Sequence, residues 1–128
     1  MRKRWVLTLF AGLAAPALAG ETVIATGMID LGSKQVCNVA NVGTKAVLVD
    51  GMRLVGFEGG AITTNLQNNC SFPAGISPGL TCSQVTSALD LGTARCEVRL
   101  SHGNAKSLRV TLETSALDGT NRATSEGR

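Results

Sequence analysis

The stretch Ala94-Arg-Cys-Glu-Val-Arg-Leu100 decides which kind of fold this chain adopts. Every second residue in it is apolar, and the residues between them are charged. The same alternation continues in Leu108-Arg-Val-Thr-Leu112. Successive side chains of a β-strand point to opposite faces of a sheet, so a period of two predicts half-buried antiparallel strands. The fold is therefore expected to be all-β.

The residues between these two strands indicate a hairpin. Ser101-His-Gly-Asn-Ala-Lys106 is rich in turn-forming residues, so we predict that the two strands pair directly with each other. Two registers keep the apolar face intact. We favour the one that places Glu97 opposite Arg109, because the other places Arg99 there, and like charges that face each other destabilise a sheet.

The beginning of the chain has the composition of a secretory signal peptide. Arg2-Lys-Arg4 precedes an apolar run from Trp5 to about Ala15, and Ala17-Leu-Ala19 forms a small-x-small exit. The apolar run is shorter than the roughly 20 residues that cross a bilayer. We therefore expect a signal peptide over residues 1–19 and export of the rest of the chain, with no membrane insertion after the leader is removed.

Removal of this leader would leave one small domain of nearly zero net charge. Three of the 12 Lys and Arg residues lie in the leader, and none of the 9 Asp and Glu residues does. The charge balance gives no reason to expect binding to nucleic acid or to an anionic membrane surface. We expect the domain to span residues 20–118 and the polar segment 119–128 to be a flexible tail.

The 4 cysteines of an exported chain predict two disulfides. Three pairings are possible. Cys70 and Cys82 flank a loop rich in proline and glycine and can close it locally, whereas Cys37 and Cys96 lie within alternating strands and can join two layers. We therefore favour Cys37–Cys96 and Cys70–Cys82. On the loop-closure estimate they stabilise the fold by about 4 and about 3 kcal/mol.

Short apolar runs separated by glycine and asparagine predict the other strands. Residues 83–91 fit a strand or a short helix equally well. We expect strands at 21–31, interrupted at Gly27, and at 35–42, 45–49, 52–57 and 61–66.

Part of this pattern resembles a known family. Cys37-Asn-Val-Ala-Asn-Val-Gly-Thr-Lys-Ala-Val47 is similar to the strand, Asn-x-Gly turn, strand signature of bacterial immunoglobulin-like and fibronectin III-like modules, and Asp50-Gly51 is similar to their next turn. The resemblance covers residues 35 to 55 and implies a two-layer immunoglobulin-like β-sandwich of about seven strands. Antibody-type domains pack a tryptophan on the disulfide between their sheets, whereas the one tryptophan here, Trp5, lies in the leader. The resemblance implies no functional residue.

The residues that could carry catalysis or bind metal form no recognisable site. The one histidine, His102, lies in the predicted turn, where neither packing nor a partner would orient it. The 9 acidic residues are scattered singly and show no pair of carboxylates that would indicate acid–base catalysis. Met28 and Met52 are isolated in apolar strands, where methionine ordinarily fills the core. We therefore predict a protein that is not an enzyme and binds no metal or cofactor.

The loop between Cys70 and Cys82 is the best candidate for an interaction site. A disulfide and two prolines would hold it in one conformation, which lowers the entropy lost when a partner binds. The alternative is that the bridge only fastens a connection between sheets. The loop residues expected to meet a partner are Phe72, Pro73, Ile76, Pro78 and Leu80.

The sequence thus predicts an exported, non-enzymatic binding or structural module, in the periplasm rather than outside the cell. One alternative is a secreted inhibitor that acts on a hydrolase through the Cys70–Cys82 loop. Another is a filament or surface-structure subunit, in which the segment Thr22–Ile29 would complete the sheet of a neighbouring subunit. The sequence suggests a protein partner but does not identify it, and it does not determine the oligomeric state.

Overall fold

The computed structural model describes residues 20–29, 33–87, 92–101, 104–116, 118 and 120–127, with the side chains of 121 and 122 excepted. The predicted signal peptide, His102 and residues 88–91 lie outside the described residues. Within them the chain is all-β, as expected, with one short 3-10 helix, η1 (Ala105–Ser107), and no α-helix.

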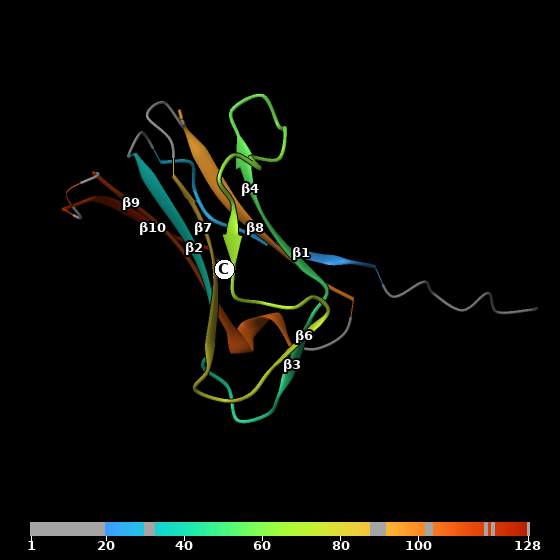
Figure 1. Ribbon diagram of the computed structural model, residues 1–128. Helices are drawn as coiled ribbons and strands as arrows, with labels where there is room; N and C mark the ends of the chain where they lie inside the picture. Colours follow the sequence, from blue (N-terminus) through green and yellow to red (C-terminus); the bar gives the residue numbers. More distant parts are fainter. Residues whose placement is uncertain are drawn as a thin grey trace, which may run out of the picture.

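The described strands, ten in all, form three sheets (Figure 1). The three-stranded sheet has the order β1-β8-β4 and consists of β1 (Thr22–Ala25), β8 (Ala94–Leu100) and β4 (Gly51–Gly56). The five-stranded sheet has the order β10-β9-β2-β7-β5 and consists of β10 (Asn121–Gly127), β9 (Leu108–Ser115), β2 (Lys34–Asn41), β7 (Thr81–Ser87) and β5 (Gln67–Asn68). The two-stranded sheet joins β3 (Val47–Val49) to β6 (Ala74–Ile76).

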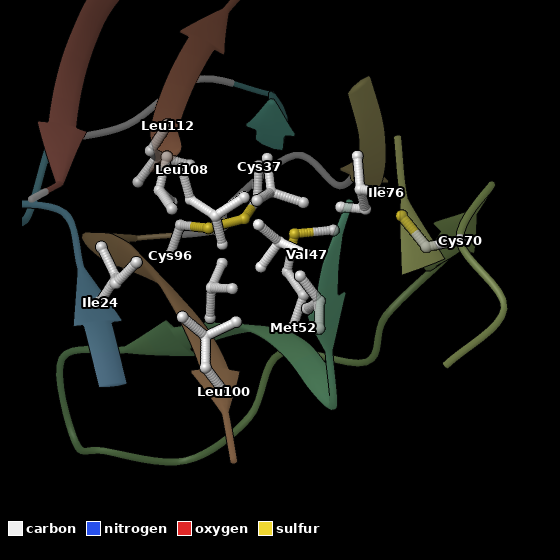
Figure 2. Packing of buried hydrophobic residues seen from close by; sticks show 14 of the residues in the cluster. Ile24, Cys37, Val47, Met52, Cys70, Ile76, Cys96, Leu100, Leu108 and Leu112 are labelled. Atoms are coloured by element: carbon white, nitrogen blue, oxygen red, sulfur yellow. A yellow bond between two sulfur atoms is a disulfide. The ribbon is translucent and has the colours of Figure 1, made fainter. Parts of the chain in front are cut away.

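The core lies between the three-stranded and five-stranded sheets, and the alternation of the sequence identifies its residues correctly. Strand β8 contributes every second residue, and so does β9. Figure 2 shows these side chains meeting around the Cys37–Cys96 bridge. The side chains that fill the centre include Ile24, Val39, Leu54, Val98, Leu100, Val110 and Leu112.

Both predicted disulfides are present. Cys37 on β2 is bonded to Cys96 on β8, with their Cα atoms 5.6 Å apart, so this bridge ties the five-stranded sheet to the three-stranded one. Cys70 is bonded to Cys82, with a Cα–Cα distance of 5.5 Å, and closes the loop between them.

The predicted pairing of β8 with β9 is wrong. β8 pairs with β1 and β4, whereas β9 pairs with β10 and β2 in the other sheet. Glu97 therefore lies opposite Ala25 on one side and Arg53 on the other. Arg109 lies opposite Ala40. The alternation is equally compatible with both arrangements, because it specifies the buried face of a strand and not its neighbour.

The segment predicted to be a flexible tail forms β10, which pairs with β9. Gly127, in this strand, also bridges to Thr26 and so connects the edges of the two larger sheets. A Cβ atom at Gly127 would lie 2.7 Å from the carbonyl oxygen of Ala25, so this approach requires glycine. Backbone pairing with β9 orders a polar segment whose composition alone favoured disorder.

Several connections also differ from the predictions. β3 pairs with β6 and not with β2, so the Asn41–Thr44 segment joins two sheets and is not a hairpin turn. Residues 61–66 form no strand apart from an isolated bridge between Ala61 and Val55, and β5 follows them. Residues 81–87 form a strand, β7. The part of the 83–91 segment that the structure describes is therefore a strand and not a helix. β1 forms one edge of its sheet.

Candidate functional site at the clamped loop

The Cys70–Cys82 loop is more ordered than its proline and glycine content predicted. Strand β6 lies within it and pairs with β3, and Ile76 at its end lies opposite Val47. Pro73 precedes β6 and Pro78 follows it, so neither proline removes a hydrogen bond from the strand. The Phe72–Pro73 peptide bond is cis, and Gly79 has a φ of 78°, in the left-handed region that glycine tolerates.

The structure divides the five predicted interaction residues into two groups. Ile76 is 4% exposed and belongs to the core, and Phe72 is half-buried against that core. These two residues therefore have a packing role. Pro73, Pro78 and Leu80 are exposed, and Leu80 has 59% of its surface accessible.

A hollow of about 300 Å³ lies inside the clamped loop, beside the disulfide. Both bridge cysteines line it, together with Pro73, Ile76 and Leu80. Ile76 thus contributes to the hollow as well as to the core. We call this cavity the loop hollow.

Strand order places further residues at the same end of the molecule. β7 and β9 both run antiparallel to β2, with Thr81 opposite Ala40 and Leu108 opposite Asn41. The residues that precede β7 and β9 therefore lie where β2 ends. Leu80, η1 and the segment after Asn41 meet there, at the lower end of the view in Figure 1. We call this region the binding end.

Asn41 holds the binding end together. Its Nδ2 donates hydrogen bonds of 2.8 Å to the carbonyl oxygens of Lys45 and Ile76, and its Oδ1 accepts one of 2.9 Å from the backbone N–H of Gly43. Its backbone N–H donates to the carbonyl oxygen of Leu80 (3.0 Å), and its own carbonyl accepts from Gly79 (2.9 Å). One buried side chain therefore joins the end of β2, the 42–46 connection and β6.

Val42 follows Asn41 and is 58% exposed, so two solvent-accessible aliphatic residues, Val42 and Leu80, lie on hydrogen-bonded neighbouring segments. Sequence reasoning missed both Asn41 and Val42 as parts of the site. The Asn-x-Gly signature predicts a hairpin turn, but neither Asn41 nor Gly43 has the positive φ that tight hairpin turns require. The signal marks instead a side chain that hydrogen-bonds the backbone around it.

The main charged cluster lies on the outer face of the three-stranded sheet, away from the clamped loop. Glu97, with 8% of its side chain exposed, forms ion pairs with Arg53 (2.7 Å) and Arg95 (2.8 Å). Burial by itself raises the pKa of Glu97. Hydrogen bonds from Arg53 and Arg95 and the positive charges of these residues lower the pKa by more than burial raises it, so the net shift is downward. Arg99 lies 3.8 Å from Glu21 across the same face.

The residues considered for metal binding are dispersed. Met52 is buried in the core and Met28 is partly exposed, while all four cysteines are in disulfides. Among the described residues, no three His, Cys, Asp or Glu side chains are grouped so that they could hold a metal ion. Within the same residues, no helix has the length and apolar character needed to cross a membrane.

Comparison with known proteins gives no assignment: no protein-family model, curated protein or solved structure matches the chain significantly.

Proposed function

We propose that this chain is an exported, non-enzymatic binding module, built as a two-layer immunoglobulin-like β-sandwich, that holds a protein partner at its binding end. The observation that carries the proposal is the exposure of Leu80 and Val42 on backbone that hydrogen bonds and a disulfide hold in place. The partner would insert an aliphatic side chain into the loop hollow beside Leu80.

Rigidity supports this proposal. Binding to a fixed surface costs less conformational entropy than binding to a loop that must first become ordered. At the binding end, the backbone of Asn41 is hydrogen-bonded to the backbone of Leu80 and Gly79, and β6 pairs with β3. The apolar groups are therefore presented in one arrangement, as they are in the centre of many protein interfaces.

The disulfide chemistry supports export. Two disulfides in a small chain are stable in an oxidising compartment, and no free cysteine is present among the described residues. Together with the composition of residues 1–19, this supports export, and the periplasm is the compartment we propose.

The structure gives less support to a filament subunit than to a hydrolase inhibitor. In a filament subunit, Thr22–Ile29 would complete a neighbouring subunit, but here β1 pairs with β8 and Ile24 is 2% exposed in its own core. A hydrolase inhibitor would use the same clamped loop, so it is a special case of the proposed binding end. It is recognised when the bound partner is a hydrolase whose activity falls.

The test is photo-crosslinking with a reactive amino acid placed at position 80, 42 or 23 of the disulfide-bonded protein. The protein is incubated with the envelope fraction of the producing cell. Val23 is 49% exposed on β1, outside the binding end, and serves as a matched control. We expect one protein to be crosslinked from positions 80 and 42 and not from position 23.

A second arm tests the same surface by substitution. Replacement of the whole loop would remove Ile76 from the core, so single changes at exposed residues are preferable. With the reactive amino acid at position 42, Leu80→Ser should abolish the crosslinked product, and Val23→Ser should preserve it. A product that survives Leu80→Ser, or that forms equally from position 23, would contradict the proposal.

A further inference from the structure

A second hollow, of about 330 Å³, lies beside Val42, between η1 and the five-stranded sheet. Its apolar lining comes from Val42, Ala105 and Leu108, and its charged lining from Lys106, Arg109 and Glu126. We call it the η1 hollow. Its volume falls within the range that small-molecule sites occupy.

The walls of the η1 hollow are fixed by backbone contacts. The N–H of Val42 donates a 2.8 Å hydrogen bond to the carbonyl oxygen of Ser107. A Cβ atom at Gly43 would lie 2.6 Å from the Ser107 hydroxyl, so glycine allows η1 to pack against the end of β2. Asn104 caps η1, because its side chain accepts a 3.0 Å hydrogen bond from the Lys106 N–H. Preformed walls reduce the cost of binding a small ligand.

The three charged side chains reach the η1 hollow from three different elements. Lys106 belongs to η1, Arg109 to β9 and Glu126 to β10. The ion pairs found among the described residues involve other side chains, so none of these three forms a direct ion pair there. Positive and negative groups therefore line one hollow whose remaining wall is apolar.

We propose that the η1 hollow binds a free α-amino acid with an aliphatic side chain. The ligand carboxylate would meet Arg109 and Lys106, its ammonium group would meet Glu126, and its side chain would lie on Val42 and Leu108. A simple carboxylate would leave Glu126 close to its negative charge without a partner, whereas a zwitterion satisfies all three charges. This site shares Val42 with the binding end but does not rest on the proposed protein partner.

The test is a titration of the disulfide-bonded protein followed by two-dimensional amide NMR, with three probes. L-Leucine carries both charges, 4-methylpentanoate lacks the ammonium group, and 3-methylbutylamine lacks the carboxylate. We expect leucine to shift the amides of residues 42–43, 105–109 and 126, and to bind roughly tenfold more tightly than either analogue, which is the lower end of what one lost hydrogen bond to a charged group implies.

Substitutions identify the charge that meets each end of the ligand. Arg109→Gln should weaken leucine binding by about tenfold. Glu126→Gln should make leucine and 4-methylpentanoate bind equally. Both side chains are exposed, so the fold should persist, and Lys34→Gln, at the opposite end of β2, is the matched control that should change nothing.

Three results would overturn the proposal. The first is 4-methylpentanoate binding as tightly as leucine to the unaltered protein, which would make the η1 hollow a carboxylate site. The second is the absence of leucine-induced shifts at tens of millimolar ligand. The third is an equal loss of affinity in Lys34→Gln and Arg109→Gln, which would indicate general attraction by surface charge. Each result leaves the protein-partner proposal standing, because that proposal is tested by crosslinking.

Discussion

At the scale of single residues, Asn41 contributes most to the structure of the binding end, through the hydrogen bonds of its side chain. It is 1% exposed, and its side chain satisfies two carbonyl oxygens and one N–H from three separate positions of the chain. A buried polar group that loses its partner retains the full cost of leaving water. No apolar side chain of similar size can replace these contacts.

Asn41→Ala should lower the free energy of unfolding by roughly 2–3 kcal/mol, because it removes the side-chain donor from the carbonyl oxygens of Ile76 and Lys45. Chemical denaturation measures the change. Asn38→Ala is the matched control, since Asn38 lies on the same strand and its side chain takes part in no hydrogen bond among the described residues. Equal losses in the two variants would contradict the role assigned to Asn41.

Glu97 gives a prediction about pH. Its folded-state pKa is lowered, so its charge stabilises the fold above the ordinary glutamate pKa, and this contribution is lost as the pH falls through that range and below it. Glu97→Gln should cost roughly 1–2 kcal/mol at neutral pH, and the difference from the unaltered protein should shrink in acid.

The measurement is unfolding free energy from about pH 7 to about pH 3, a range that includes the ordinary glutamate pKa of about 4.3. Glu113→Gln, on β9, is the control, because Glu113 has no ion pair among the described residues. A pH-independent difference between Glu97→Gln and the unaltered protein would show that the ion pairs with Arg53 and Arg95 do not contribute.

At the scale of elements, β10 closes the side of the molecule where the edges of the two larger sheets meet. Its last residue, Gly127, bridges to Thr26 at a distance that leaves no space for a side chain. β10 also supplies Glu126 to the η1 hollow. The position of this strand therefore affects both the stability of the fold and the proposed ligand site.

Gly127→Ala should destabilise the protein by roughly 1–3 kcal/mol, because the new methyl group would collide with the backbone of β1. Gly51→Ala is the matched control. A Cβ atom at Gly51 meets nothing within 4 Å, and alanine in a strand costs less entropy than glycine, so its effect should be neutral or stabilising. Thermal unfolding of both variants separates the two effects, and similar melting temperatures would contradict the close approach.

The sequence predicts features that depend on one strand alone better than features that depend on contacts between distant strands. The alternation in β8 and β9 correctly predicted which apolar residues enter the core, because side-chain period depends on the strand itself. Which strands pair with β8 and β9 depends on contacts with residues far along the chain. The turn residues between β8 and β9 are compatible with a hairpin and equally with a connection from one sheet to the other. β10 was missed for the same reason, since its stability comes from pairing with β9.

The candidate site was predictable in part. The cysteine positions indicated both bridges, because one pair flanks a loop and the other lies in strands. The loop's exposed residue Leu80 followed from its sequence, whereas Ile76 proved to be a core residue. Val42 and the charges of the η1 hollow were not predictable, because only the order β10-β9-β2 brings them together.

At the scale of the whole molecule, both proposed sites depend on the position of β2 between β7 and β9. Because both neighbours run antiparallel to β2, the residues that precede them lie where β2 ends. If β9 paired with β8 instead, Val42 and Arg109 would not line one hollow. The arrangement of three strands thus links the disulfide-bonded core to the surface that we propose for binding.

The most direct test of this arrangement is a set of backbone nuclear Overhauser effects from the oxidised protein in solution. We predict cross-strand contacts that connect Cys37 to both Gln84 and Leu112, because β2 pairs with β7 and β9 at those positions. Cross-strand contacts that connect Glu97 to Arg109 would instead show β8 paired with β9 in one sheet, and would contradict the fold on which both proposals rest.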